Sequence, residues 1–285
     1  MIKNKKYNTI IKIIVVILFI ILLCWYGMAA YIHVNSQISY GYKPGMPPRY
    51  VAHRGLSGEY FENSYDAFFY AEKSSFFGGI ECDIWKTLDD VWVCCHDDTP
   101  FVDKTIKVTE SKYDDIKNLP LDTSSKGENV VIEKELYITT YEQFLSIMRY
   151  STKQAFVEIK KEYEKSDIEK LVDYTRSRSN MSKIVFISFH IKVMEMVQSY
   201  RPTASVMPLS NNIFVTYFLA KMGYNMGISK KIIDKKPSMI ELVHSSKSFV
   251  YVYTVNNLEE ANKYIDMGVD YIATDYILTK QGGKN

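Results

Sequence analysis

Beyond residue 49, short apolar runs alternate with segments in which apolar residues recur at helical spacing. This alternation is typical of βα units, and it predicts a mainly parallel sheet with helices packed around it. The chain of 285 residues is long enough for one α/β barrel after a leader is subtracted. Nine runs are predicted as strands: Tyr50–His53, Gly79–Ile84, Val91–His96, Ala155–Lys160, Lys183–Phe189, Ala204–Leu209, Met226–Ser229, Phe249–Val255 and Tyr271–Thr274.

A barrel offers eight places for these nine strands. We assign the surplus to Val91–His96, which is predicted to form a hairpin with the strand before it. Helix boundaries are also readable. Asn63, Thr140 and Ser166 each stand three residues before an acid or amide and are predicted to cap helices, and two glycines are predicted to end helices in the left-handed conformation. These are Gly223 and Gly268.

The N-terminus is patterned differently. Residues 13–32 contain no charge, and as a helix they would span about 30 Å, the thickness of the hydrocarbon core of a bilayer. Residues 1–12 carry four lysines, and no charged residue follows them until Lys43. The positive-inside rule therefore predicts a single-pass anchor in the cell membrane, with residues 1–12 in the cytoplasm and the rest outside.

A cleaved signal peptide is the alternative, because Gly27-Met28-Ala29 offers the small residues that a signal peptidase reads. The apolar run is longer than the hydrophobic region of an ordinary signal peptide, which favours a retained anchor. Residues 33–49 contain several glycines and prolines and are predicted to be a linker to a domain at 50–285.

Composition narrows the choice of partners. The first 32 residues carry four lysines and no acid, so the remainder has 31 basic and 33 acidic residues. The net positive charge of the whole chain therefore belongs to the anchor. No stripe of basic residues interleaved with aromatic residues appears beyond it, so the sequence predicts no binding to nucleic acid.

A few polar residues interrupt the predicted strands. Glu81 and Asp83 stand two apart in a strand and so share one face, as two ligands of one hard cation would. Glu158 also lies within an apolar strand, where an unpaired charge would be costly. His53 and His96 each end a strand, which is where the active site of a barrel lies.

A series of short motifs runs through the chain after residue 48. They are His53-Arg54-Gly55, Glu62-Asn63-Ser64, Glu81-Cys82-Asp83, His96-Asp97, Val157-Glu158-Ile159-Lys160, Ile187-Ser188-Phe189, Tyr253-Thr254-Val255-Asn256 and Gly268-Val269-Asp270 to Thr274-Asp275. Their order and spacing resemble the glycerophosphodiester phosphodiesterase family. The resemblance implies a TIM-type (β/α)8 barrel, preceded here by one transmembrane helix. It also implies a small insertion or lid at the polar, turn-rich region 101–136, for which a plain solvated connection is the alternative.

The resemblance implies that His53 and His96 are the catalytic pair. Phosphodiester cleavage needs one proton removed from the attacking hydroxyl and one delivered to the leaving alkoxide, and imidazole can do either. The sequence leaves open which histidine is the acid and which is the base.

The resemblance further implies that Glu81, Asp83 and Glu158 bind one divalent cation. Three oxygen ligands favour Ca²⁺ or Mg²⁺ over zinc. Arg54 and Lys160 suit contacts to the substrate phosphate, and ion pairs with the carboxylates are the structural alternative for both. Three further residues have smaller roles: Glu62 is predicted to support the site, Asn63 to cap the following helix, and Tyr253 to help hold the alcohol.

The chain departs from the family pattern at three positions. Phe61 stands where the family usually has proline, Asp90 where it has glycine, and Tyr253 where it has tryptophan. None of these changes removes a reacting group.

The expected function is metal-dependent hydrolysis of glycerophosphodiesters to glycerol 3-phosphate and an alcohol. One alternative is a phospholipase D-like enzyme that acts on lysolipids or sphingolipids. The other is a barrel that only binds an anionic polymer of the cell envelope, although both histidines and all three carboxylates are present.

Overall fold

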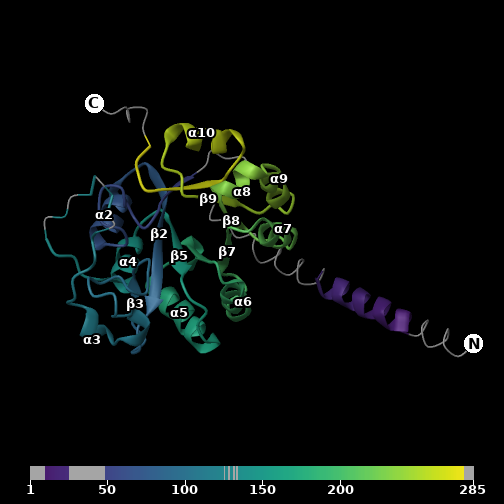
Figure 1. Ribbon diagram of the computed structural model, residues 1–285, viewed down its shortest axis with the longest axis horizontal. Helices are drawn as coiled ribbons and strands as arrows, with labels where there is room; N and C mark the ends of the chain where they lie inside the picture. The colour runs from purple at the N-terminus through teal and green to yellow at the C-terminus, as the bar shows by residue number, and fades with distance from the viewer. Residues whose placement is uncertain are drawn as a thin grey trace, which may run out of the picture.

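The computed structural model describes residues 10–25, 49–124, 126–127, 129–130, 132 and 134–278 (Figure 1). Within them, eight parallel strands close into a barrel, because β1 pairs with both β10 and β2. This confirms the predicted TIM-type fold. The barrel strands are β1 (Arg49–Ala52), β2 (Phe77–Lys86), β5 (Gln154–Ile159), β6 (Ile184–Ser188), β7 (Ser205–Ser210), β8 (Met226–Ser229), β9 (Val250–Tyr253) and β10 (Tyr271–Thr274).

The surplus strand forms the predicted hairpin. β3 (Trp92–Cys94) pairs antiparallel with the last third of β2, with Ile84 opposite Cys94. A short strand that the sequence did not predict, β4 (Thr139–Thr140), pairs in turn with β3. The sheet therefore leaves the barrel through β2, the longest of the described strands.

Helices pack around the outside of the barrel. They are α2 (Tyr65–Lys73), α4 (Tyr141–Met148), α5 (Lys165–Arg178), α6 (Ile191–Tyr200), α7 (Ile213–Lys221), α8 (Lys230–Lys235), α9 (Ser238–His244) and α10 (Leu258–Asp266). Thr140 forms the predicted capping box with Gln143. Gly223 and Gly268 adopt the predicted left-handed conformation, with φ angles of 87° and 86°.

Two predicted caps were wrong. Ser64, and not Asn63, caps α2 by accepting a hydrogen bond from the amide of Ala67. Asn63 is instead held in the left-handed region by other contacts. Helix α5 begins before Ser166, with Glu164 at its N-cap and no side-chain cap.

Side chains on the strands alternate between two cores. Those that face outward join the helices in the main hydrophobic cluster, while those that face inward fill the barrel. The inward cluster holds Val51, Phe156, Val185, Ile187, Met207, Leu209, Phe249, Tyr251, Tyr271 and Ala273. On β2 the inward position beside this cluster is Gly79, where a Cβ would lie only 2.9 Å from the ring of Phe156. A glycine is needed there to admit that ring.

The described part of the region 101–136 has its own small core. It contains the 3-10 turn Val108–Glu110 and the short helix α3 (Tyr113–Ile116). Phe101, Val108, Ile116 and Leu121 pack there against Val93 of β3 and are buried. The described part of this region thus packs around its own core, and its role as an insertion or lid stays a prediction.

Residues 10–25 form a helix that lies apart from the barrel in Figure 1. Among the residues that the structure describes, no helix has both the length and the apolar character needed to span a bilayer. Residues 26–32 of the predicted anchor, and most of the predicted linker, lie outside the described residues.

Candidate active site

Strand alternation brings the polar residues singled out in the sequence to one end of the barrel. His53 follows the inward-facing Val51, Glu81 and Asp83 follow Gly79, and Glu158 follows Phe156. Each polar residue lies on the carboxyl side of the inward-facing residue named for its strand, so together they form a layer above the apolar core.

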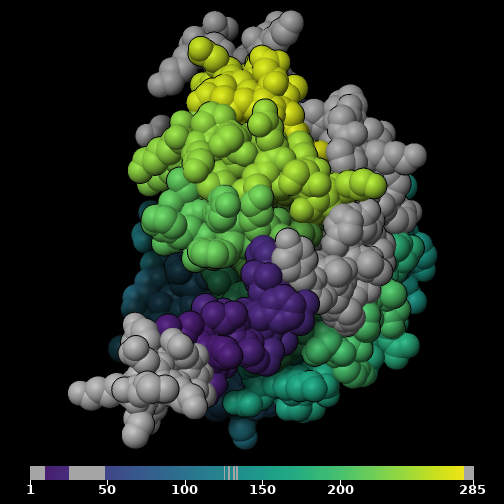
Figure 2. All heavy atoms as spheres, turned by 90° about the vertical axis from the view of Figure 1, so that its right-hand side faces the viewer, coloured from purple at the N-terminus to yellow at the C-terminus, as the bar shows by residue number. Residues whose placement is uncertain are grey.

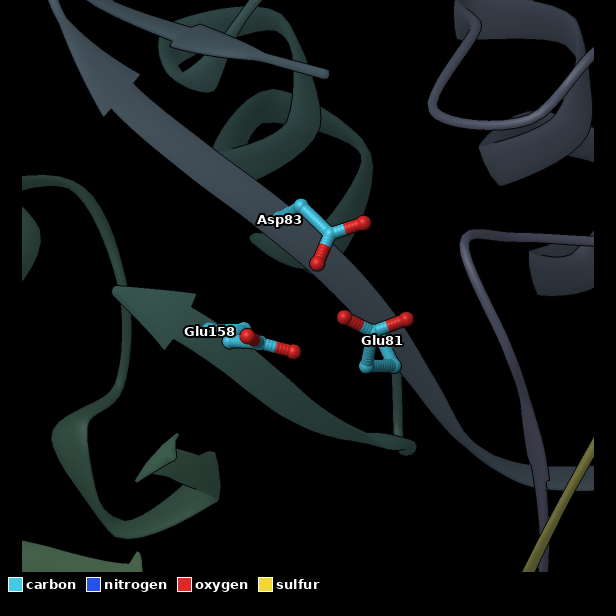
Figure 3. A group of neighbouring side chains, drawn as sticks. All are labelled: Glu81, Asp83 and Glu158. Carbon is cyan, nitrogen blue, oxygen red and sulfur yellow. The ribbon is translucent and has the colours of Figure 1, made fainter. Parts of the chain in front are cut away.

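The three carboxylates form a buried cluster. Oxygen atoms of Glu81, Asp83 and Glu158 all lie within 4.8 Å of one another. Figure 3 shows Glu81 and Asp83 on β2 pointing toward Glu158 on the neighbouring β5. Oε1 of Glu81 is buried and has no hydrogen-bond partner among the described residues. An unpartnered carboxylate oxygen in this position suits a cation ligand, because burying such an oxygen without a partner is costly.

The environment separates the pKa values of the three carboxylates. Burial, followed by repulsion from Asp83 and Glu158, raises the pKa of Glu81 well above its usual range. Burial and Asp83 raise the pKa of Glu158 to about 7. Burial alone would raise the pKa of Asp83, but the charges of Lys160 and Arg54 lower it to about 2. With all three groups ionised, the cluster would hold more negative charge than its neighbours neutralise, which is the electrostatic condition for binding a cation.

Two basic side chains, Lys160 and Arg54, lie close to this cluster. Nζ of Lys160 lies 3.0 Å from Glu158 and 3.2 Å from Asp83. Arg54 donates from its backbone amide to Oε2 of Glu81 at 2.7 Å, and its Nη1 lies 2.6 Å from Glu62. The predicted supporting position of Glu62 thus corresponds to an ion pair that orients the guanidinium.

His53 is held by a carboxylate that the sequence analysis did not select. Its Nδ1 lies 2.7 Å from Oδ1 of Asp275, which directly follows β10. Asp275 also accepts hydrogen bonds from Ser57 and Asn256. Burial alone would raise the pKa of Asp275, but these hydrogen bonds, led by that of His53, lower it below its usual value. Asp275 is therefore a charged acceptor at neutral pH.

His96 reaches the site from the hairpin. It follows β3, and its backbone carbonyl accepts a hydrogen bond from Nε1 of Trp85 on β2 at 3.2 Å. Nδ1 of His96 lies 3.0 Å from the carboxylate of Asp97. Burial, followed by the positive charge of Arg54, lowers the pKa of His96.

These groups surround one cavity of about 230 Å³. Its lining residues are His53, Arg54, Glu81, His96, Glu158, Lys160, Ile187, Phe189, Leu209, Tyr251, Tyr253 and Thr254. Tyr253 donates its hydroxyl to the carbonyl of Ser210 at 3.0 Å, and its ring meets that of Phe189 edge to face. One side of the cavity is thus charged and the other is aromatic and apolar.

Asn63 belongs to the site and not to a helix cap. Its Nδ2 donates to Oδ2 of Asp83 at 2.9 Å, and its Oδ1 accepts from the backbone amide of Asp83 at 3.0 Å. This pair of bonds fixes the direction of one carboxylate of the cluster. The predicted cap failed because Ser64, one residue later, takes the capping position.

The sequence profile of the glycerophosphoryl diester phosphodiesterase family matches residues 53–279. A comparison with curated proteins found no match. Among solved structures, a glycerophosphodiester phosphodiesterase from Parabacteroides distasonis is 21% identical with a TM-score of 0.65, and the match covers 82% of this chain and 94% of that chain.

Two other solved structures share the fold. A glycerophosphodiester phosphodiesterase from Agrobacterium tumefaciens is 20% identical with a TM-score of 0.64, and the match covers 81% of this chain and 97% of that one. A phosphodiesterase from Oleispira antarctica, solved in complex with the product sn-glycerol-3-phosphate, is 19% identical with a TM-score of 0.68, and here the shares are 80% and 93%.

The family profile begins at His53, directly after β1, and runs through the other seven barrel strands to a point beyond β10. The chain therefore belongs to the glycerophosphoryl diester phosphodiesterase family and is a phosphoric diester hydrolase.

Proposed function

We propose that the barrel hydrolyses glycerophosphodiesters to glycerol 3-phosphate and an alcohol, with His53 and His96 transferring the protons and a divalent cation held at the carboxylate cluster. The observation that carries the proposal is the shared cavity. The cavity is lined by both histidines, by two of the three carboxylates, and by the basic side chains of Arg54 and Lys160. A phosphodiester placed there meets every group that the reaction needs.

His53 is proposed as the base that activates the attacking hydroxyl. Charged Asp275 can only accept a hydrogen bond, so Nδ1 of His53 must donate it. This leaves Nε2 of the neutral ring without its proton and able to remove one. His96, in its imidazolium form, is then proposed to protonate the leaving alkoxide. If a cyclic phosphate forms first, the two histidines exchange roles when water opens it.

Glu81, Asp83 and Glu158 are proposed to hold Ca²⁺ or Mg²⁺. An all-oxygen donor set suits either ion, and the unpartnered oxygen of Glu81 supports the fit. Such a cation, when bound, polarises a phosphoryl oxygen. Arg54 and Lys160 are proposed to contact the phosphate, since both border the cavity while remaining paired to carboxylates.

We further propose that residues 13–32 anchor the chain in the cell membrane, with the barrel on the outer side. The support comes from the uncharged run and the lysines that precede it. A substrate released from membrane lipids would then reach the cavity without crossing the bilayer.

The test is glycerol 3-phosphate release by the full chain in detergent. The substrates are glycerophosphocholine, glycerophosphoethanolamine, glycerophosphoglycerol and lysophosphatidylcholine, each with Ca²⁺, with Mg²⁺ and with chelator. Release from the first three, lost on chelation and in His53→Ala and His96→Ala, is the expected result. His244→Gln is the matched control, because His244 pairs with Asp270 away from the cavity. Choline release from the lysolipid alone would favour the phospholipase D-like alternative.

A further inference from the structure

Helix α7 is apolar on both of its sides. Its residues Ile213–Lys221 read IFVTYFLAK, and Thr216, Leu219 and Ala220 face the barrel and are buried. Phe214, Val215, Tyr217 and Phe218 face outward, and we call these four residues the α7 face. A helix on the surface of a soluble protein normally turns polar residues outward, so an outer layer of aromatic residues indicates that another apolar phase covers it.

The exposure of the α7 face is large. Phe214 is 73% exposed and Phe218 is 59% exposed. Neighbouring Tyr217 and Phe218 meet edge to face. Phe189, at the cavity, is also 47% exposed. Figure 2 views the molecule from the side on which α6, α7 and α9 lie.

Positive charge is frequent in the segment that contains α7 and the two helices after it, of which α9 packs against α7 and α8 packs against α9. The segment 211–247 carries six lysines and only two acids, whereas the chain after residue 32 is net negative. Lys231, Lys235 and Lys236, on α8 and at its end, are exposed and pair with no carboxylate among the described residues. At the end of α7, Lys221 contacts the ring of Tyr217.

We propose that the α7 face docks on an anionic bilayer surface, with its aromatic side chains in the interface and Lys221 and the exposed lysines of α8 on the lipid headgroups. Aromatic residues combined with unpaired lysines are the composition that such an interface selects. A second copy of the chain fits less well, because a symmetric contact would bring the same lysines together. The inference goes beyond the proposed function, because an anchor at residues 13–32 would hold the barrel near the membrane without fixing which side of the barrel faces the bilayer.

Docking in this way would set the cavity near the lipid headgroups. Ser210 lies three residues before the start of α7. Its backbone carbonyl accepts the hydrogen bond from the hydroxyl of Tyr253, which lines the cavity. The first turn of α7 is therefore at the same end of the barrel as the active site.

The experiment places a tryptophan on this face in the full chain. Phe214→Trp is mixed with vesicles of phosphatidylcholine and phosphatidylglycerol that carry brominated acyl chains, and its emission is compared with that of the unsubstituted chain. The matched control is Tyr150→Trp, because Tyr150 is 86% exposed just after α4, on the other side of the barrel. The expected result is that the added tryptophan at 214 loses most of its emission and the one at 150 does not.

Further measurements separate the alternatives. Replacing Lys231, Lys235 and Lys236 by serine is expected to reduce the quenching at 214, with docking weakened roughly fivefold per lysine. Equal quenching at 150, or none at 214, overturns the proposal. A face that instead binds protein would leave 214 unquenched by vesicles. Glycerol 3-phosphate release from soluble substrates is measured on the same preparations, so loss of that activity is seen separately from loss of docking.

Discussion

Nδ1 of His53 and Oδ1 of Asp275 lie 2.7 Å apart, although 222 positions separate them in the chain. Closure of the barrel brings them together, because β1 and β10 are paired neighbours. The imidazole that we propose as the base is thus oriented by the residue that directly follows β10.

Asp275→Asn should lower turnover by roughly 10²-fold or more, because an amide no longer fixes the tautomer or stabilises the protonated ring. KM should change little, since Asp275 does not line the cavity. Steady-state kinetics checks this. Ser57→Ala removes another hydrogen bond to the same carboxylate and is the control, with a much smaller loss. Equal kcat in Asp275→Asn and the unsubstituted chain would contradict the positioning role.

The same carboxylate should make stability depend on pH. The pKa of Asp275 is lower in the folded chain than its ordinary value of 3.8. Its ionised form therefore stabilises the fold above that value, and the contribution disappears as the pH falls through the lowered folded pKa. Urea denaturation should show Asp275→Asn less stable than the unsubstituted chain at neutral pH, with the gap narrowing in acid. A gap independent of pH would argue against an ionised Asp275.

Glu81→Gln should affect the chain differently with and without a divalent cation. Without one, glutamine replaces a carboxyl group whose ionisation is opposed by burial and by the neighbouring carboxylates, so the melting temperature should hold or rise. With Ca²⁺ or Mg²⁺, the unsubstituted chain should gain stability by mass action and the variant should not. Calorimetry with each ion measures both effects. A variant that still gains stability from the cation would exclude Glu81 as a ligand.

Asn63→Ala should weaken cation binding by about 10–100-fold, because the amide that directs Asp83 is lost. Ser64→Ala is the neighbouring control. It removes the cap of α2 and should cost about 1 kcal/mol of folding stability while leaving cation affinity nearly unchanged. Isothermal titration and denaturation distinguish the two, and an equal loss of affinity in both variants would assign Asn63 a merely structural role.

Tyr253→Phe should change the preference among alcohols more than the rate of cleavage. The substitution removes the hydrogen bond to the carbonyl of Ser210, worth about 1 kcal/mol, and frees the ring at the apolar side of the cavity. The ratio of kcat/KM for glycerophosphocholine to that for glycerophosphoglycerol is the measurement. An unchanged ratio together with a large fall in kcat would show that Tyr253 acts on the reacting groups instead.

The periodicity of the strands and the order of the motifs were enough to predict the strands of the barrel and the residues that gather at its cavity. All nine predicted strands form, and the hairpin at Val91–His96 is where the surplus strand was placed. The roles proposed for the site residues stay predictions, but His53, Glu81, Glu158, Lys160 and His96 do surround one cavity.

What the sequence missed depends on contacts between distant segments. Asp275 carried a readable signal, since it continues the inward alternation of Tyr271 and Ala273, as His53 continues that of Val51. Asn63 had a local pattern that fits a cap equally well, and only the fold places Asp83 beside it. Side-chain amides serve both purposes, so local spacing cannot distinguish them.

The length of β2 ties the proposed cation site to the region 101–136. Its first part is a barrel strand that carries Glu81 and Asp83, and its last residues form the edge on which β3, β4 and the small core of the insertion are assembled. The insertion is therefore not an exchangeable module. A chimera that replaces this region with that of a relative would have to keep β2 and β3 from the same parent. Otherwise a change made for substrate choice would disturb the residues proposed to bind the cation.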